Sequence, residues 1–200
     1  MDFCNTVDVT EVDHVLKIGG NSPGLDCRGL SLLGVKLYGI NLTGANLSGV
    51  NLTGANLSGA TLAGANFTGA DLCSANLGTA NFTGADLREA NLPSADLRSA
   101  NCDGADLRKA RMTGADLRGA SFRGANLAGA HLNATNLDAA FFEDATLTDV
   151  NLQGAYWTDA TVWPRGVTPP PSREPDVPWW QQIQRQPRES MKILWKKIGE

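Results

Sequence analysis

The chain has few of the residues that build catalytic or metal-binding sites. Its 200 residues include only two histidines, His14 and His131, and four cysteines, and these do not form a closely spaced metal-ligand pattern. No Gly-rich loop between a strand and a helix offers a phosphate site, and no Ser/His/Asp arrangement stands out. We therefore expect neither an enzyme nor a bound cofactor.

The sequence also lacks the features of exported and membrane-spanning proteins. No run of about 18 apolar residues occurs, so no membrane-spanning helix is predicted. The first residues, Met1 to Asn5, lack the basic and apolar regions of a secretory signal. The cysteines suit a reducing compartment, with Cys27 and Cys102 expected inside the fold and Cys73 outside. These observations favour a cytoplasmic protein.

What the chain does contain is one five-residue pattern, roughly Ala-Asn/Asp-Leu-X-Gly, repeated from Cys27 to Val162. Counting one central residue every fifth position over that interval gives 28 repeats, of which 19 are centred on Leu and four on Phe. A period of five fits neither a helix nor a strand, so the backbone must turn once in every repeat. The Asn/Asp and Gly positions provide residues suited to turns, while Leu and Ala point inward. The pattern predicts a solenoid with a columnar core.

Two stretches of the sequence, ANLSGVNLTGANLSGATLAGANFTGADL and ADLRSANCDGADLRKARMTGADLRGA, resemble the pentapeptide-repeat family. The resemblance covers residues 25–163. It implies an all-β fold, a right-handed quadrilateral β-helix with four repeats per coil and about seven coils. Phe82, Phe122 and Phe142 would then share one side with Cys102 and form an aromatic ladder in the core.

The two ends depart from the repeat. Residues 1–24 are predicted to form an N-terminal cap with a short helix from Glu11 to Ile18. After Val162, the Trp163-Pro164-Arg165-Gly166 ending is similar to that of many bacterial, notably cyanobacterial, members of the family. Large Trp rings there can cover the last coil.

Residues 164–178 are predicted to form a Pro-rich linker, and residues 179–200 a basic amphipathic tail that ends in a short helix. Three interpretations of the tail stay open: it folds back on the rod, binds a partner, or makes weak contact with an anionic membrane.

The surface of the rod offers a repeated Ala-Asp-Leu-Arg motif. Its spacing of ten residues should stack Arg88 and Arg108 on one side, with Arg98 and Arg118 opposite. These ladders either neutralise themselves or form a mixed-charge strip that binds a protein. The candidate interaction residues of the rod and tail are Arg88, Arg98, Arg108, Arg118, Arg123, Trp179, Trp180, Met191, Leu194, Trp195 and Ile198.

The favoured function is a non-enzymatic protein–protein interaction scaffold or regulator that binds an unidentified protein partner. One alternative is a DNA mimic that modulates DNA gyrase, as some members of the family do. Against it, the five arginines interrupt any acidic stripe and no inserted loop breaks the repeats. A second alternative is a peripheral membrane protein anchored by the tail. Direct nucleic-acid binding is not expected, because the rod is acidic and only the tail is basic.

Overall fold

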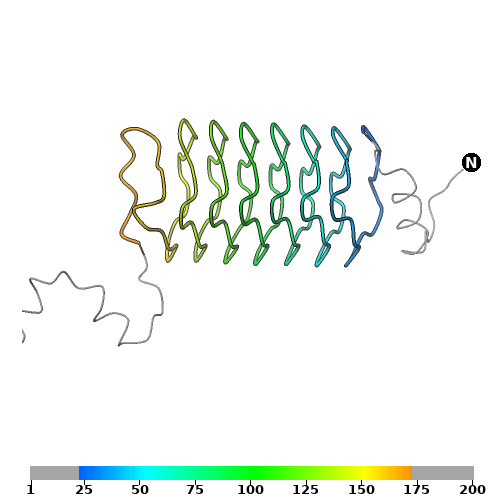
Figure 1. The fold of residues 1–200 in the computed structure, drawn as a ribbon, viewed down its shortest axis with the longest axis horizontal. Coiled ribbons are helices and arrows are strands. Elements are labelled where there is room, and N and C mark those ends of the chain that lie inside the picture. The colour runs from blue at the N-terminus through cyan, green and yellow to red at the C-terminus, as the bar shows by residue number, and fades with distance from the viewer. Residues whose placement is uncertain (1–22, 173–200) are drawn as a thin grey trace, which may run out of the picture.

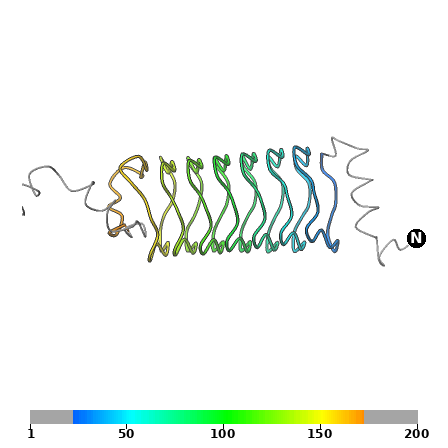
Figure 2. The ribbon, with the colours of Figure 1, turned by 60° about the horizontal axis from the view of Figure 1, so that its bottom comes forward.

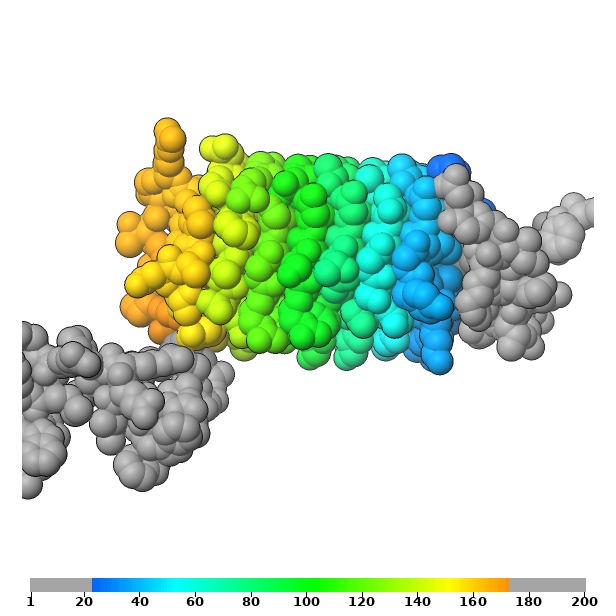
Figure 3. Space-filling model, in the orientation of Figure 1, coloured from blue at the N-terminus to red at the C-terminus, as the bar shows by residue number. Residues whose placement is uncertain are grey.

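The computed structural model describes residues 23–172, which form a straight rod of stacked coils (Figure 1). Each coil has four sides of one pentapeptide each, and residues 20 apart in sequence pair in parallel register. Within residues 23–172 there is no helix and no longer strand; the sheets consist of single bridged residues, from Asp26 to Val162. The coils stay aligned when the rod is turned (Figure 2). The side of the rod seen in Figure 3 has no deep cleft.

We name the four sides A to D in chain order, so that A lies opposite C, and B opposite D. The central residues of side A begin at Cys27, those of B at Leu32, those of C at Leu37 and those of D at Leu42, and each recurs every 20 residues as far as Trp157. Each central residue points inward. The residues directly before and after it lie on the outer surface of that side, and the residue two positions after it forms the corner.

The backbone of each coil is hydrogen-bonded to the coils before and after it. The Leu52 N–H donates to the carbonyl of Asp71 in the next coil at 2.7 Å, and the Asn56 N–H donates to Val35 in the previous coil at 2.8 Å. Within the coil, the Ala55 N–H closes the turn by donating to Leu52 at 2.9 Å. Because the same three bonds recur along the rod, most inner backbone groups are satisfied without long strands.

The five-residue pattern follows from the geometry of the corner. All 27 corner residues from Gly24 to Gly154 have a positive φ, and ten of them are not glycine; Ala134, for example, has a φ of +57°. The Asn/Asp side chain before the centre stabilises the same turn, as where the Asn66 Oδ1 accepts the Thr68 N–H at 2.9 Å. Glycine and Asn/Asp are therefore turn-forming residues here, as the sequence predicted.

The core is a column of Leu, Ala and Phe side chains that are almost fully buried. The rings of Phe122 and Phe142 stack with centroids 5.1 Å apart and an interplanar angle of 5°, which confirms this part of the predicted ladder. Cys102 fills the place between Phe82 and Phe122 and is also buried. Burial raises the pKa of its thiol to about 12, so Cys102 remains protonated and acts as a small apolar residue.

The prediction that the register continues unbroken to Val162 is wrong. Phe141 pairs with Val162, 21 residues later, whereas the preceding pairs are 20 apart. The extra residue shifts Val162 to an outward position and makes Trp163 the inward residue. The Trp163 ring stacks on Phe142 at 5.2 Å with an interplanar angle of 9°, so it extends the aromatic ladder. A large flat ring packs on the face of Phe142 better than valine does, and this stacking stabilises the shifted register.

The end of the described chain covers part of the last coil. The Trp157 ring packs edge-on against Trp163 at 5.4 Å. The Ser172 hydroxyl lies 2.9 Å from both the N–H and the carbonyl oxygen of Trp157, and so takes the place of a further coil. The predicted helix at 11–18, the linker beyond residue 172 and the tail at 179–200 lie outside the described residues. In the part of the chain that is described, no helix is long and apolar enough to cross a membrane.

Candidate functional site

Paired hydrogen bonds join the Asp and Arg side chains of the ladder on side A. The Arg88 Nε donates to the Asp86 Oδ1 at 2.8 Å, and its Nη2 donates to the Oδ2 at 2.6 Å. The same carboxylate accepts the Arg88 backbone N–H at 3.1 Å. The Nε of Arg88 is also 3.8 Å from Asp106 in the next coil. These hydrogen bonds fix the orientation of the Arg88 guanidinium relative to the Asp86 carboxylate.

Side C carries the same arrangement on the opposite surface. Arg98 donates to Asp96 through Nε at 2.9 Å and Nη2 at 2.6 Å, and its Nε lies 3.9 Å from Asp116. These hydrogen bonds hold the pKa of Asp96 below its ordinary value of 3.8. The side chain of Arg98 is still 56% exposed, so part of its guanidinium remains accessible. The stacking predicted for the four arginines on two opposite sides is confirmed.

Arg123 occupies a different environment, on side D. Its guanidinium carbon lies 4.3 Å from the centroid of the Phe141 ring, and its Nη2 donates to Glu143 at 3.3 Å. The Arg123 backbone N–H donates to the Asp103 carboxylate in the previous coil at 3.0 Å. The sequence analysis missed Phe141, although an aromatic residue where the repeat has Asn or Asp is a visible signal.

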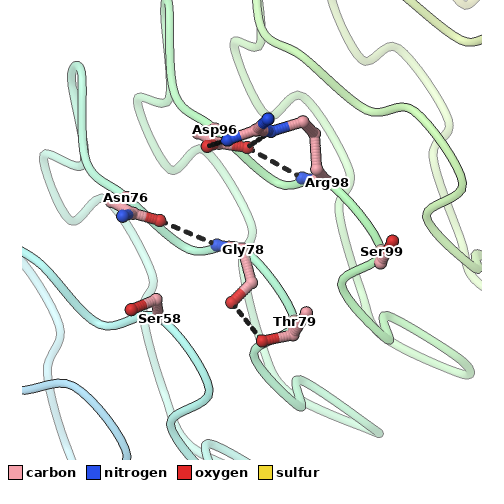
Figure 4. A pocket seen from close by; sticks show the side chains of 7 residues that line it. All are labelled: Ser58, Asn76, Gly78, Thr79, Asp96, Arg98 and Ser99. Atoms are coloured by element: carbon pink, nitrogen blue, oxygen red, sulfur yellow. Dashed lines mark hydrogen bonds and ion pairs between the residues drawn. The ribbon is translucent and has the colours of Figure 1, made fainter.

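A hollow of about 440 Å³ opens on side C beside Arg98 (Figure 4). Its floor is Gly78, which stands where the neighbouring coils carry Ser58 and Arg98. A Cβ added to Gly78 would lie 3.4 Å from the Asn76 Oδ1. Within residues 23–172, Gly78 is the one glycine directly after a central residue, so this outward position carries no side chain. The hollow is lined by Ser58, Asn76, Gly78, Thr79, Asp96, Arg98 and Ser99.

The sequence analysis did not single out this hollow, because it treated every glycine of the rod as a corner residue. The signal was the position of Gly78, one residue before a corner that is occupied by Thr79. Thr79 takes the positive φ of the corner at +56°. Its hydroxyl donates to the carbonyl of Gly78 at 2.7 Å.

A second hollow, of about 410 Å³, lies at the end of the rod and is lined by Glu143, Asp144, Trp163 and Arg165. Within residues 23–172, no three His, Cys, Asp or Glu side chains are grouped so that they could hold a metal ion. The tail candidates Trp179, Trp180, Met191, Leu194, Trp195 and Ile198 lie outside the described residues, so their role stays a prediction.

Comparison with known families identifies the repeat. The model of the family described as pentapeptide repeats, in eight copies, matches residues 40–78, 75–114 and 125–156, which together exceed half of the chain. The protein therefore belongs to the pentapeptide repeat family, and its rod is a right-handed β-helix solenoid. A search of curated proteins found no match.

Solved structures that are similar to this chain include pentapeptide repeat proteins. HetL, involved in heterocyst differentiation regulation in the cyanobacterium Nostoc sp. strain PCC 7120, is 25% identical over 78% of this chain and 100% of its own, with a TM-score of 0.29. QnrB1, a plasmid-mediated fluoroquinolone resistance protein, is 20% identical over 68% of this chain and 81% of its own, with a TM-score of 0.35. A protein of the Arabidopsis thaliana thylakoid lumen is 34% identical over 58% of this chain and 71% of its own, with a TM-score of 0.25.

Proposed function

We propose that this protein is a non-enzymatic scaffold that binds a partner protein through side C of its rod. The observation that carries the proposal is the position of the exposed Arg98 guanidinium beside the hollow over Gly78. Within residues 23–172 the core is filled by apolar side chains and the Asp and Arg side chains of the ladders pair with each other on the surface, so binding fits this geometry better than catalysis.

Arg98 is suited to a protein interface because its conformation is already fixed. Its Nε and Nη2 are occupied by Asp96, and no hydrogen bond within residues 23–172 uses its Nη1. A partner carbonyl or carboxylate that accepts from the Nη1 would therefore immobilise little additional side chain. Arginine is also one of the residue types enriched where binding energy is concentrated.

The hollow beside Arg98 gives the partner a place to insert a side chain. Its walls carry the hydroxyls of Ser58 and Ser99 and the ion pair of Asp96 and Arg98, so they suit a polar or amphipathic side chain. The other arginine ladder, on side A, lies on the opposite surface and provides an internal comparison. We place this scaffold in the cytoplasm, which cell fractionation would test.

The test is affinity purification from the native cell with the full chain and two variants of side C. Gly78→Tyr should fill the hollow, and Arg98→Ala should remove the guanidinium; both should lose the same partner while the thermal melt stays close to that of the original chain. The matched control is Arg88→Ala on side A, which removes the equivalent ion pair and should keep the partner.

Retention of the partner by both side C variants would refute the assignment to this side. A partner that is lost only when the chain is ended near Pro178 would instead point to the tail.

A further inference from the structure

Four exposed charged residues near the corner between sides A and B lack the pairing seen in the ladders. Glu89, Lys109 and Asp149 lie at the corner itself, and Arg111 is the first outward residue of side B. Arg88, Arg98, Arg108, Arg118 and Arg123 each pair with a carboxylate. Within residues 23–172, by contrast, Glu89, Lys109, Arg111 and Asp149 form no ion pair. These charges are available to another molecule.

Lys109 and Asp149 are two coils apart in one column, with Gly129 midway between them. Lys109 leans toward that gap, since its Cγ is 3.6 Å from where a Cβ on Gly129 would lie. The residue before Gly129 is Ala128, so the corner is low at its midpoint. Between these two residues the column therefore has a cation at one end, a carboxylate at the other and a flat centre, while Glu89 lies one coil before Lys109, outside these three rows.

We propose that side B binds a second copy of this chain, with the two rods antiparallel. The two-fold axis would lie in the plane of the contact, perpendicular to the rods, along the row of Gly129, His131 and Asn133. A rotation about that axis reverses the order of the coils, so Lys109 meets Asp149 of the second copy, and Asp149 meets its Lys109. Such self-complementarity is what an isologous dimer contact requires.

The remaining residues of side B are compatible with the same arrangement. Arg111 would lie opposite Asn151 of the second copy, and Thr113 opposite its Gln153, which pairs hydrogen-bond donors with acceptors. Asn133 would lie opposite itself, and its amide can both donate and accept. From Arg111 to Gln153, the residues directly before and after each centre of side B include no carboxylate, so no acidic pair would be forced together.

Other sides of the rod are less suited to this contact. The same rotation about Arg123 on side D would bring Arg123 against itself and Asp103 against Glu143, which places like charges together. On side C, Arg98 and Arg118 are already paired with their own aspartates, and Lys36 lies several coils away from them. Compared with sides C and D, side B is therefore the side on which unpaired charges of opposite sign would face each other in the dimer.

The contact is small, which sets the strength of the dimer. Three matched rows span about 14 Å at the usual strand spacing of about 4.8 Å. A contact of this length buries much less surface than the roughly 1,200 Å² of a stable interface. The dimer should therefore be weak, should form at high protein concentration, and should dissociate as salt screens its two Lys–Asp pairs.

Charge reversal tests the pairing directly by sedimentation equilibrium of the full chain at low salt. Lys109→Glu or Asp149→Lys alone should raise the dimer dissociation constant by about tenfold or more, because each introduces two like-charge contacts. The double variant should return it to near the original value. The two positions have matching φ of +58° and +57°, so the exchange adds no new backbone strain. Lys36→Glu, an exposed change on side C, is the control and should leave the constant unchanged.

Cross-linking tests the position of the axis in a background with Cys4→Ser and Cys73→Ser. Asn133→Cys should form a disulfide-linked dimer on mild oxidation, because its sulfur would meet its own copy. Thr83→Cys, exposed on the opposite side D, should not. A chain that stays monomeric at every concentration, or a double variant that fails to restore the dimer, would overturn the proposal. Neither outcome bears on partner binding by side C.

Discussion

The change of register at the end of the rod can be tested by exchanging two neighbouring residues for alanine. Trp163 is the inward residue in the structure; it stacks on Phe142 at 5.2 Å and meets Trp157 edge-on at 5.4 Å. Complete burial would make a Trp→Ala change cost about 3–5 kcal/mol. Because Trp163 is only partly buried, we expect Trp163→Ala to lower the free energy of unfolding by about 2–4 kcal/mol.

Val162 provides the matched comparison because it is adjacent and points outward. Its backbone groups bond to Ala140 and Phe142 whatever the side chain, so Val162→Ala should cost less than about 1 kcal/mol. Urea unfolding followed by circular dichroism gives both values, and limited proteolysis reports whether the last coil frays alone. A larger loss for Val162→Ala than for Trp163→Ala would mean that the register is unbroken, and would refute the argument from the aromatic ladder.

Four further outcomes are expected. Leu117→Ala should lower the free energy of unfolding by about 3 kcal/mol because Leu117 is buried, whereas Arg118→Ala should lower it by less than about 1 kcal/mol because Arg118 is an exposed ion-pair partner. Equal losses in urea unfolding would contradict the inward and outward assignment. Ala134→Gly should stabilise the rod by about 1 kcal/mol, since alanine is strained at a φ of +57°, and a lower melting temperature would speak against this. Hydrogen bonds from Arg88 and Arg98 hold the pKa values of Asp86 and Asp96 below 3.8. The stability that these two carboxylates contribute is therefore present above pH 3.8 and should disappear as the pH falls through their lowered pKa values, which urea unfolding as a function of pH would measure. Supercoiling by purified gyrase should be little affected by this protein, because its arginines interrupt the acidic surface; strong inhibition in a gel assay would favour the DNA-mimic alternative.

The sequence predicted the features of the fold that repeat, and it failed where one residue departs from the repeat. The inward column follows from the five-residue spacing, and the opposed ladders of Arg88 and Arg98 follow from that spacing together with the four-sided coil that the family resemblance implies. The shift at Val162 could not be read from spacing, because the five-residue count continues to fit while stacking on Phe142 decides the register. The hollow over Gly78 was missed because glycine was assigned to corners.

Departures from the repeat are also where recognition should lie. Coils that carry only Asn, Ser and Thr on their outer surface present nearly the same groups on every side, as at Asn66 and Thr68, whose side chains hydrogen-bond to each other. A partner could shift by one coil on such a surface with little change in its contacts. Gly78 breaks this equivalence by removing one outward side chain, and Arg98 adds a directed donor in the next coil. A protein that binds one position on a repetitive rod needs both kinds of feature, and side C has them next to each other.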